Sequence, residues 1–260
     1  MKTVYYYQTF EGLDKLMTHP EDVDIIIVSS IHFGKDGNGT PNIYLNDNLP
    51  SDDKFTTLWK ETEELSKKNV TITCMMGGAG LAYRVLFDNF DTYYPLLVQM
   101  IQTYSWISGI DLDIEEEVDL DNVKMLIDKL NQDFGSDFII SMAPVSSSLE
   151  NDGVGMGNFS YKTLYNTEQG KRINWFNCQA YNSFSSDTLS KIVANGYPAD
   201  KIIMGMESAQ FTGDEYLPEI RKMKETHPDI NGVYDWEYFD APPECQKDPS
   251  EWCKLIKNLN

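Results

Sequence analysis

Three carboxylic acids stand at alternate positions in one short segment, which reads Ser-Gly-Ile-Asp-Leu-Asp-Ile-Glu over residues 108–115. Side chains alternate between the two faces of a strand, so Asp111, Asp113 and Glu115 are expected to share one face. Burying three unpaired anions together is prohibitive, so at least one should hold a proton near neutral pH within a coupled group. An acid that stays protonated at neutral pH is what the cleavage of a glycosidic bond requires.

The acidic character continues beyond this segment in Glu116, Glu117 and Asp119, which we interpret as a solvated acidic turn. The same interpretation does not suit residues 110–115, because it would expose the intervening isoleucine and leucine side chains to water. We therefore expect the alternating acids to point into the interior of a folded domain.

Short apolar segments alternate with longer amphipathic segments along the whole chain. Apolar residues three and four positions apart predict helices, for example over residues 53–67 and 122–132. Segments rich in β-branched and aromatic residues, bounded by Gly, Pro, Asn or Asp, predict strands. The predicted strands cover residues 3–9, 24–31, 70–76, 109–115, 138–143, 173–181, 201–206 and 232–236.

Eight strands that alternate with helices predict parallel pairing through right-handed crossovers. A barrel closes eight such units, whereas a doubly wound sheet usually stops at about five or six strands. No linker or internal repeat interrupts the chain, so we predict one α/β domain over residues 1–260, a (β/α)8 TIM barrel. In such barrels the chemistry lies where the strands end, which is where Glu115 would stand.

The segment over residues 108–115 resembles the D-G-x-D-x-D-x-E signature of glycoside hydrolase family 18, the chitinases and related endo-β-N-acetylglucosaminidases. Four further matches stand in the family's order along the chain. Residues 75–78 (Met-Met-Gly-Gly) stand where the family has S-x-G-G, and residues 141–144 (Ser-Met-Ala-Pro) where it has M-A-P. Residues 179–182 (Gln-Ala-Tyr-Asn) resemble its Q-x-Y-N variant, and Trp236 matches a tryptophan of its last strand.

The resemblance implies a role for each matched residue. Glu115 would be the general acid and later the base that activates water, and Asp111 would share a proton with Asp113. Asp113 would orient the 2-acetamido group of the substrate and stabilise the positive charge that this group acquires. Tyr181 would hydrogen-bond the acetamido oxygen, and Trp236 would form the floor of the subsite where the bond breaks. Such enzymes retain anomeric configuration with the substrate's own acetamido oxygen as the nucleophile, which implies N-acetylglucosamine on the non-reducing side of the cut.

Other residues of the matched segments are candidates for binding the substrate. Gln179 and Asn182 flank Tyr181, and Met142 belongs to the M-A-P match, where it would form part of the wall. Packing in the core is the alternative for Tyr181 and Trp236, as it is for most aromatic side chains in barrels. His32, near the end of the second predicted strand, could line the cleft or be a structural histidine.

Two residues depart from the family pattern. Ser108 replaces the first aspartate of the signature, at the base of its strand, where little catalytic effect is expected. Met75 replaces the serine of S-x-G-G, whose hydroxyl would help stabilise charge on Asp111, so its loss should raise the pKa of Asp111 and could slow turnover. Tyr6 is expected to contribute a hydroxyl instead, unless one of its two tyrosine neighbours is the inward residue.

The amino-acid composition limits the classes of partner that we expect. The net charge of −20 arises from 41 acidic against 21 basic residues, and a surface this negative repels phosphate backbones and anionic lipids. We therefore expect neither a nucleic acid nor a membrane as partner, although simple solubility also explains the charge. The expected partner is an oligosaccharide or polysaccharide that contains N-acetylglucosamine. We expect a monomer with no cofactor and no metal.

The cysteines and the N-terminal residues are relevant to the cellular compartment in which we expect the protein. Cys74 and Cys178 lie in apolar strand segments and are expected to be buried free thiols, whereas Cys245 and Cys253 could form a disulfide in an oxidising compartment. The first residues lack the long apolar core of a signal peptide. The chain as written is thus expected in the cytoplasm, or outside the cell if a signal peptide has been removed.

The connection before the last predicted strand limits the shape of the cleft. About 25 residues separate the last two strands, and one helix over residues 214–224 would use most of them. The α+β insertion that deepens the groove in some chitinases of the family would not fit, so we expect an open groove and endo-acting, weakly processive cleavage.

Two alternatives to a glycosidase remain open. An inactive sugar-binding lectin of the same fold is one, although such relatives usually lose the acid that Glu115 represents. A phosphodiesterase that uses the carboxylates to bind magnesium or calcium is the other, but it requires further metal ligands and basic residues that the sequence does not supply convincingly. The natural glycan could be chitin, its oligomers, a peptidoglycan-like chain or the chitobiose core of N-glycans.

Overall fold

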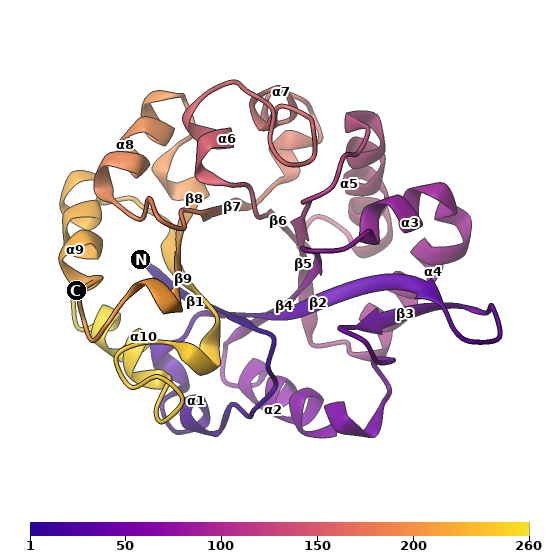
Figure 1. Ribbon diagram of the computed structural model, residues 1–260, viewed down its shortest axis with the longest axis horizontal. Coiled ribbons are helices and arrows are strands. Elements are labelled where there is room, and N and C mark those ends of the chain that lie inside the picture. The colour runs from indigo at the N-terminus through magenta and orange to yellow at the C-terminus, as the bar shows by residue number, and fades with distance from the viewer. Residues whose placement is uncertain (260) are drawn as a thin grey trace.

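The computed structural model of the protein describes residues 1–259. Eight parallel strands form a closed barrel, because β1 pairs with β9 on one side and with β2 on the other (Figure 1). This confirms the predicted (β/α)8 TIM barrel. The barrel strands are β1 (Lys2–Tyr7), β2 (Ile25–Lys35), β4 (Thr71–Gly77), β5 (Ile107–Asp113), β6 (Ile139–Met142), β7 (Trp175–Gln179), β8 (Ile202–Glu207) and β9 (Gly232–Trp236).

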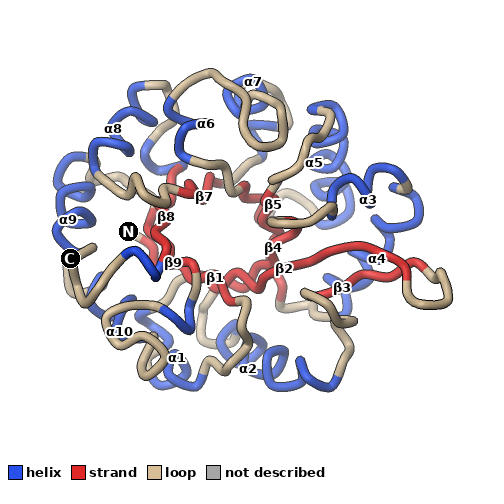
Figure 2. The backbone as a smooth tube through the Cα atoms, in the orientation of Figure 1, coloured by secondary structure: helices blue, strands red, loops and turns tan. Residues whose placement is uncertain are grey.

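Helices surround the barrel on its outside (Figure 2). They are α1 (Asp14–Thr18), α2 (Thr56–Ser66), α3 (Ala82–Asp88), α4 (Phe90–Thr103), α5 (Leu120–Phe134), α6 (Ser146–Glu150), α7 (Tyr161–Tyr165), α8 (Ser186–Ala194), α9 (Leu217–Thr226) and α10 (Ser250–Lys257). Short 3-10 turns cover Pro20–Asp22, Asp53–Phe55, Gly170–Arg172, Ala199–Lys201, Ser208–Gln210 and Tyr238–Asp240.

The helix α5 shows how the sequence sets these elements. The Asp119 carboxylate accepts a hydrogen bond from the Asp121 N–H and caps the start of the helix, which ends at Gly135 with a φ of 87°. Its apolar stripe, including Val123 and Leu126, is fully buried against the barrel. The predicted helix over residues 122–132 therefore lies inside α5, and capping explains the additional residues at each end.

The barrel has two separate apolar cores. The larger core lies between the strands and the helices, and a small core fills the inside of the barrel. Alternation along each strand divides the side chains between the two, so that Tyr6 points inward while Tyr5 and Tyr7 point outward. The inner core consists of Val4, Tyr6, Ile25, Ile27, Met75, Trp175, Ile203 and Tyr234.

One strand was not predicted. β3 (Pro41–Leu45) pairs antiparallel with the C-terminal part of β2, which continues to Lys35, well past the expected end at residue 31. The resulting hairpin projects from the barrel rim in Figure 1. Its turn reads Asp-Gly-Asn-Gly over residues 36–39, which is a hairpin signal that the sequence contained.

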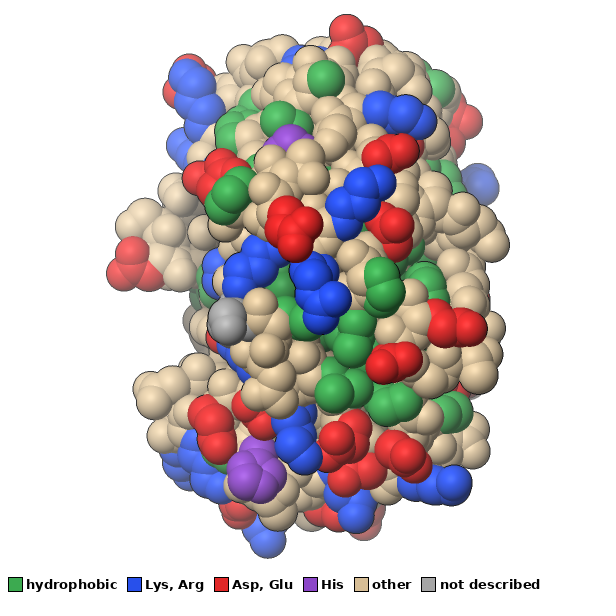
Figure 3. All heavy atoms as spheres, turned by 90° about the vertical axis from the view of Figure 1, so that its left-hand side faces the viewer, with side chains coloured by type: hydrophobic (Ala, Val, Ile, Leu, Met, Phe, Trp, Pro, Cys, Tyr) green, Lys and Arg blue, Asp and Glu red, His purple; other side chains and the backbone are tan. Residues whose placement is uncertain are grey.

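The connection from β8 to β9 contains the 3-10 turn Ser208–Gln210 and the helix α9. No further domain is inserted in this part of the described chain, as predicted. The outer face around α8 and α9 carries acidic and basic side chains side by side, with small apolar patches between them (Figure 3). Within residues 1–259, no helix is long and apolar enough to cross a membrane.

The four cysteines are free thiols. Cys74 and Cys178 are fully buried, as predicted, and burial raises the pKa of each thiol. Cys245 is exposed whereas Cys253 is buried on the inner side of α10, so the disulfide left open by the sequence is not formed in this structure.

Candidate active site

The three acids line up along β5 and just beyond its end, toward the C-terminal rim of the barrel. Asp111 is fully buried, Asp113 is 5% exposed, and Glu115 is half-buried two residues beyond the end of the strand. The intervening Ile110, Leu112 and Ile114 pack in the outer core. The predicted alternation is therefore confirmed, and burial decreases from the interior toward the rim.

Asp111 is surrounded by neutral hydrogen-bond donors. The Tyr6 hydroxyl donates to Oδ2 at 2.6 Å, and the Ser141 hydroxyl and the Asn177 amide donate to Oδ1 at 2.6 and 2.9 Å. Burial raises the pKa of Asp111, while these three hydrogen bonds act in the opposite direction. Within the described chain both oxygens bond to these donors and neither bonds to Asp113, so the direct sharing of a proton that the resemblance implies is not made in this structure.

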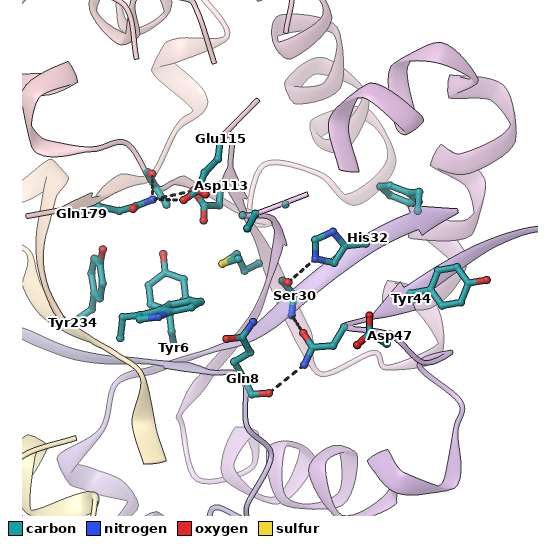
Figure 4. Close-up of a pocket in the computed structure, with 18 of the residues that line it drawn as sticks. Tyr6, Gln8, Ser30, His32, Tyr44, Asp47, Asp113, Glu115, Gln179 and Tyr234 are labelled. Carbon is teal, nitrogen blue, oxygen red and sulfur yellow. Dashed lines mark hydrogen bonds between the residues drawn. The ribbon is translucent and has the colours of Figure 1, made fainter. Parts of the chain in front are cut away.

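Gln179 connects the other two acids. Its Nε2 donates to Asp113 Oδ1 at 3.0 Å and, at a longer 3.4 Å, to Glu115 Oε1, and it also bonds the Ala143 carbonyl oxygen at 2.8 Å (Figure 4). One amide thus holds both carboxyl groups on the same side of the cleft. Burial, reinforced by the charges of Glu115 and Asp111, raises the pKa of Asp113 well above its usual range. These surroundings favour the protonated form of Asp113.

Two glycines let β4 approach the acids closely. Gly77 has a φ of 98°, and a Cβ atom there would lie 2.2 Å from the Asp113 carbonyl oxygen. The N–H of Gly78 donates to that same oxygen at 2.9 Å. The Gly-Gly pair of the predicted motif is thus required by the geometry, since a side chain at residue 77 would displace the strand that carries Asp113.

Aromatic side chains form the wall of the barrel mouth across from these acids. The rings of Tyr6 and Trp236 lie 5.3 Å apart, and those of Tyr6 and Tyr234 lie 4.9 Å apart. Tyr181 follows β7 and remains half-buried, with its hydroxyl group 3.2 Å from that of Tyr234. Tyr6, Tyr181 and Trp236 therefore lie in one cleft with Asp113 and Glu115, as expected.

The cleft has a volume of about 930 Å³ and extends from Trp236 across the barrel mouth onto the β2–β3 hairpin. His32, Tyr44 and Asp47 line this outer arm (Figure 4). The Ser30 hydroxyl lies 2.8 Å from His32 Nε2, so this histidine both lines the cleft and has a structural partner. Burial lowers the pKa of His32.

Two predicted contacts are absent from the cleft. Met142 is fully buried in the outer core, because its neighbour Ser141 occupies the inward position of β6. Asn182 is exposed in the turn after β7, with a φ of 60°, and its backbone N–H donates to Gln210 Oε1. Asparagine tolerates this left-handed conformation, which explains the residue without a substrate. Neither residue lines the cleft in this structure, so the geometry does not support the prediction that they bind substrate.

Three residues of the site were missed. Ser141 and Asn177 hold Asp111, and Tyr234 contacts Tyr181. The same alternation that places Gln179 inward also places Asn177 inward, so the period of β7 contained this signal.

The departures from the family pattern have different consequences. Ser108 lies at the opposite end of β5, where its hydroxyl donates to the Ile72 carbonyl oxygen. Met75 pairs with Asp111 in register and is buried in the inner core. It offers no hydroxyl, but Tyr6, Ser141 and Asn177 supply Asp111 with three donors.

No family model and no curated protein matches the sequence, whereas solved structures do. A fungal endo-β-N-acetylglucosaminidase from glycosyl hydrolase family 18 is 28% identical, with a TM-score of 0.86 over 100% of this chain and 98% of its own. A chitinase from Aspergillus fumigatus is 29% identical, with a TM-score of 0.85 over 99% and 98%. A GH18 chitinase from Pseudoalteromonas aurantia, 19% identical with a TM-score of 0.74 over all of both chains, shows the shared fold. These comparisons confirm the resemblance to family 18 and support a glycosidase at the level of the family.

Proposed function

We propose that this chain is a retaining, endo-acting glycoside hydrolase that cleaves β-1,4 bonds after N-acetylglucosamine, with Glu115 as acid and base. The observation that carries the proposal is the alternation of Asp111, Asp113 and Glu115 along β5 and just beyond its end, which places Asp113 and Glu115 in a single cleft with Tyr181. An open cleft of about 930 Å³ accommodates several sugar units.

In the first step, Glu115 gives its proton to the glycosidic oxygen, and the bond from this oxygen to C1 breaks. The half-buried position of Glu115 at the rim leaves it accessible to the bond, while Gln179 fixes the position of its carboxyl group. The leaving sugar departs as a neutral alcohol, and Glu115 becomes a carboxylate.

The nucleophile is the acetamido oxygen of the sugar itself, which forms a bond to C1 and closes an oxazolinium ring. Positive charge then develops on the acetamido nitrogen, and Asp113 accepts a hydrogen bond from its N–H. The Tyr181 hydroxyl donates to the acetamido oxygen and orients it. Since Asp113 is almost fully buried, water competes little for these contacts.

In the second step, the Glu115 carboxylate removes a proton from a water molecule, which attacks C1 and opens the ring. Two displacements at C1 from opposite faces restore the original configuration. Glu115 regains the proton that it lost, so the catalytic cycle closes. The proposed reaction therefore consumes one water molecule for each bond.

The proposed bond joins two N-acetylglucosamine units, and it occurs both in chitin oligomers and in the chitobiose core of N-glycans. The two neighbours above 25% identity are named for one activity each. Turnover of chitotetraose should therefore be compared with release of the glycan from a high-mannose glycopeptide. The ratio of the two kcat/KM values assigns the substrate.

The decisive test is the variant Glu115→Gln, assayed on a chromogenic chito-oligosaccharide. We expect kcat to fall by about 10²–10⁴, with oligosaccharide binding retained, because the amide keeps its shape but has no proton to give. Glu117→Gln is the matched control, since Glu117 is exposed in the same loop and bonds Asn158. Product anomers followed by proton NMR at early times should keep the β configuration.

Two outcomes would contradict the proposal. A Glu115→Gln variant that retains most of its activity would remove Glu115 from the role of acid. A wild-type protein that binds chito-oligosaccharides without cleaving either substrate would instead be a lectin of the same fold.

A further inference from the structure

Tyr234, on β9, lies between Tyr181, which the proposed mechanism uses, and Tyr6, which holds Asp111. Its ring is fully buried in the inner core, 4.9 Å from the ring of Tyr6 and 6.4 Å from that of Tyr181. Tyr6 donates to Asp111 and Tyr181 faces the cleft. Figure 4 shows Tyr234 beside Tyr6 on the side of the cleft across from Gln179 and Asp113.

The direction of the hydrogen bond between the two hydroxyl groups follows from their surroundings. The Tyr234 hydroxyl lies 3.2 Å from the Tyr181 hydroxyl, which is its only acceptor within the described chain. A buried hydroxyl that fails to donate carries a free-energy penalty, so Tyr234 must give its proton to the Tyr181 oxygen. Tyr181 is half-buried at the cleft, and its own proton is then free to point at a bound molecule.

A glycine on the neighbouring strand leaves space for the Tyr234 ring inside the barrel. Gly205 of β8 pairs in register with Tyr234, and a Cβ atom at residue 205 would lie 1.9 Å from Tyr234 Cζ and 2.3 Å from its hydroxyl oxygen. The ring is thus held between the Gly205 backbone, Tyr6 and Tyr181. Because these contacts fix the ring, the Tyr234 hydroxyl can donate its hydrogen bond in one direction, toward the Tyr181 oxygen.

We propose that Tyr234 is a positioning residue that aims the Tyr181 hydroxyl proton at the acetamido oxygen of the substrate. The inference rests on the proposed substrate-assisted hydrolysis, since it assigns the acceptor of that proton. By donating to the Tyr181 oxygen, Tyr234 prevents Tyr181 from turning its own proton inward, and it strengthens Tyr181 as a donor because consecutive hydrogen bonds polarise one another.

The test is a double-mutant cycle with Tyr234→Phe, Tyr181→Phe and the double variant. Tyr234→Phe should lower kcat/KM on chitotetraose by about five-fold, the effect of losing one neutral hydrogen bond. In the Tyr181→Phe background the same change should have almost no effect, because no hydroxyl remains to be aimed. Tyr216→Phe is the control, since it removes a buried tyrosine hydroxyl that contacts the Pro242 carbonyl oxygen outside the cleft.

The binding of chitotetraose in a Glu115→Gln background separates this inference from the proposed reaction. Tyr234→Phe should weaken binding when Tyr181 is present and not when it is phenylalanine. If the wild type binds but does not cleave, the proposed hydrolysis fails, and these two binding ratios still decide the role of Tyr234. Equal effects of Tyr234→Phe with and without Tyr181, no effect in either background, or no binding at all would overturn the inference.

Discussion

The three acids on and just beyond β5 have different surroundings. Asp111 accepts hydrogen bonds from two hydroxyl groups and an amide, Asp113 accepts one from Gln179, and Glu115 opens toward solvent at the rim. Burial raises the pKa of both inner acids, and neighbouring negative charge adds to this effect at Asp113. The two buried carboxyl groups of one strand thereby acquire pKa values above the usual range for different combinations of causes.

Asp113→Asn is expected to lose activity and gain stability. Turnover should fall by about 10²–10³, because the amide pairs poorly with the developing positive charge. The folded-state pKa of Asp113 is raised, so the folded protein keeps a proton that the unfolded chain has already released. Above the unfolded pKa, this acid therefore contributes a destabilisation that grows with rising pH until the folded pKa is passed.

Melting temperatures of the wild type and Asp113→Asn, measured at pH 4 and pH 7, test whether Asp113 destabilises the folded protein at neutral pH. The variant should gain a few degrees over the wild type at pH 7 and little at pH 4, since about 1 kcal/mol moves the melting temperature of a domain of this size by roughly 2–4 °C. A variant that is less stable than the wild type at pH 7 would show that Asp113 is a stabilising anion.

The acids could be predicted from the sequence, because strand alternation needs only the local pattern. Tyr234 could not, because its significance depends on Tyr181, 53 positions away, and on Gly205 in a third strand. Met142 shows the opposite error: a family motif includes it, but Ser141 occupies the inward position of β6. A motif identifies a segment, whereas the register of the barrel decides which of its side chains reach the cleft.

Among the elements, the ends of β4 and β5 approach each other closely at Gly77. Gly77→Ala should destabilise the protein by about 1–3 kcal/mol, because the left-handed backbone and the nearby Asp113 carbonyl oxygen both oppose a Cβ atom. Activity should fall with it, since the strand that carries Asp113 must move.

Gly37→Ala is the matched control for this strand contact. Nothing lies within 4 Å of a Cβ atom at residue 37, in the turn of the β2–β3 hairpin. Chemical denaturation of both variants should place Gly37→Ala within about 0.5 kcal/mol of the wild type. Similar losses in the two variants would mean that the strand contact has no special importance.

The β8–β9 connection predicts the mode of cleavage. This connection contains a 3-10 turn and α9 and, within the described residues, no inserted domain. We therefore expect a long polymer to enter and leave the cleft sideways. We expect a broad range of product lengths and an early fall in viscosity when a long soluble polymer is digested. Release of dimers almost exclusively, with viscosity hardly changed, would show a processive enzyme instead.

The elements were predictable where periodicity is strong, as in α5 and the barrel strands. The β2–β3 hairpin was not predicted, since the predicted second strand ends at residue 31 whereas β2 continues to Lys35 and pairs with β3. This error affects function, because the hairpin forms the outer arm of the cleft.

For the whole molecule, the net charge of the protein and the formal charge of the residues that line the cleft are both negative. The chain carries a charge of −20, and the cleft lining in the described residues includes Asp47, Asp113 and Glu115 but no lysine or arginine. A glycan that bears carboxylates, such as a muramic acid chain, is therefore a poorer expected substrate than a neutral one. A partially deacetylated oligomer, which carries ammonium groups, should be attracted.

Salt should separate these two substrates. Between about 0.01 M and 0.15 M salt, the screening length shortens from roughly 30 Å to 8 Å. We expect kcat/KM for a partially deacetylated chito-oligosaccharide to fall by about ten-fold over this range, the lower end of electrostatic steering. The fully acetylated oligomer of the same length should change little. The same salt dependence for both oligomers would mean that the protein charge does not guide the substrate.

The closure of the barrel has a consequence for biosynthesis. The strand made first, β1, finds one of its two neighbours only in β9, where Lys2 pairs with Gly232 and Tyr5 with Asp235. Until that last strand leaves the ribosome, β1 and β8 each present an unpaired edge, and the cleft lacks Tyr234 and Trp236. A nascent chain therefore exposes strand edges that can aggregate or bind chaperones for nearly the whole of its synthesis. A chain truncated before residue 232 is expected neither to close its barrel nor to form the complete cleft.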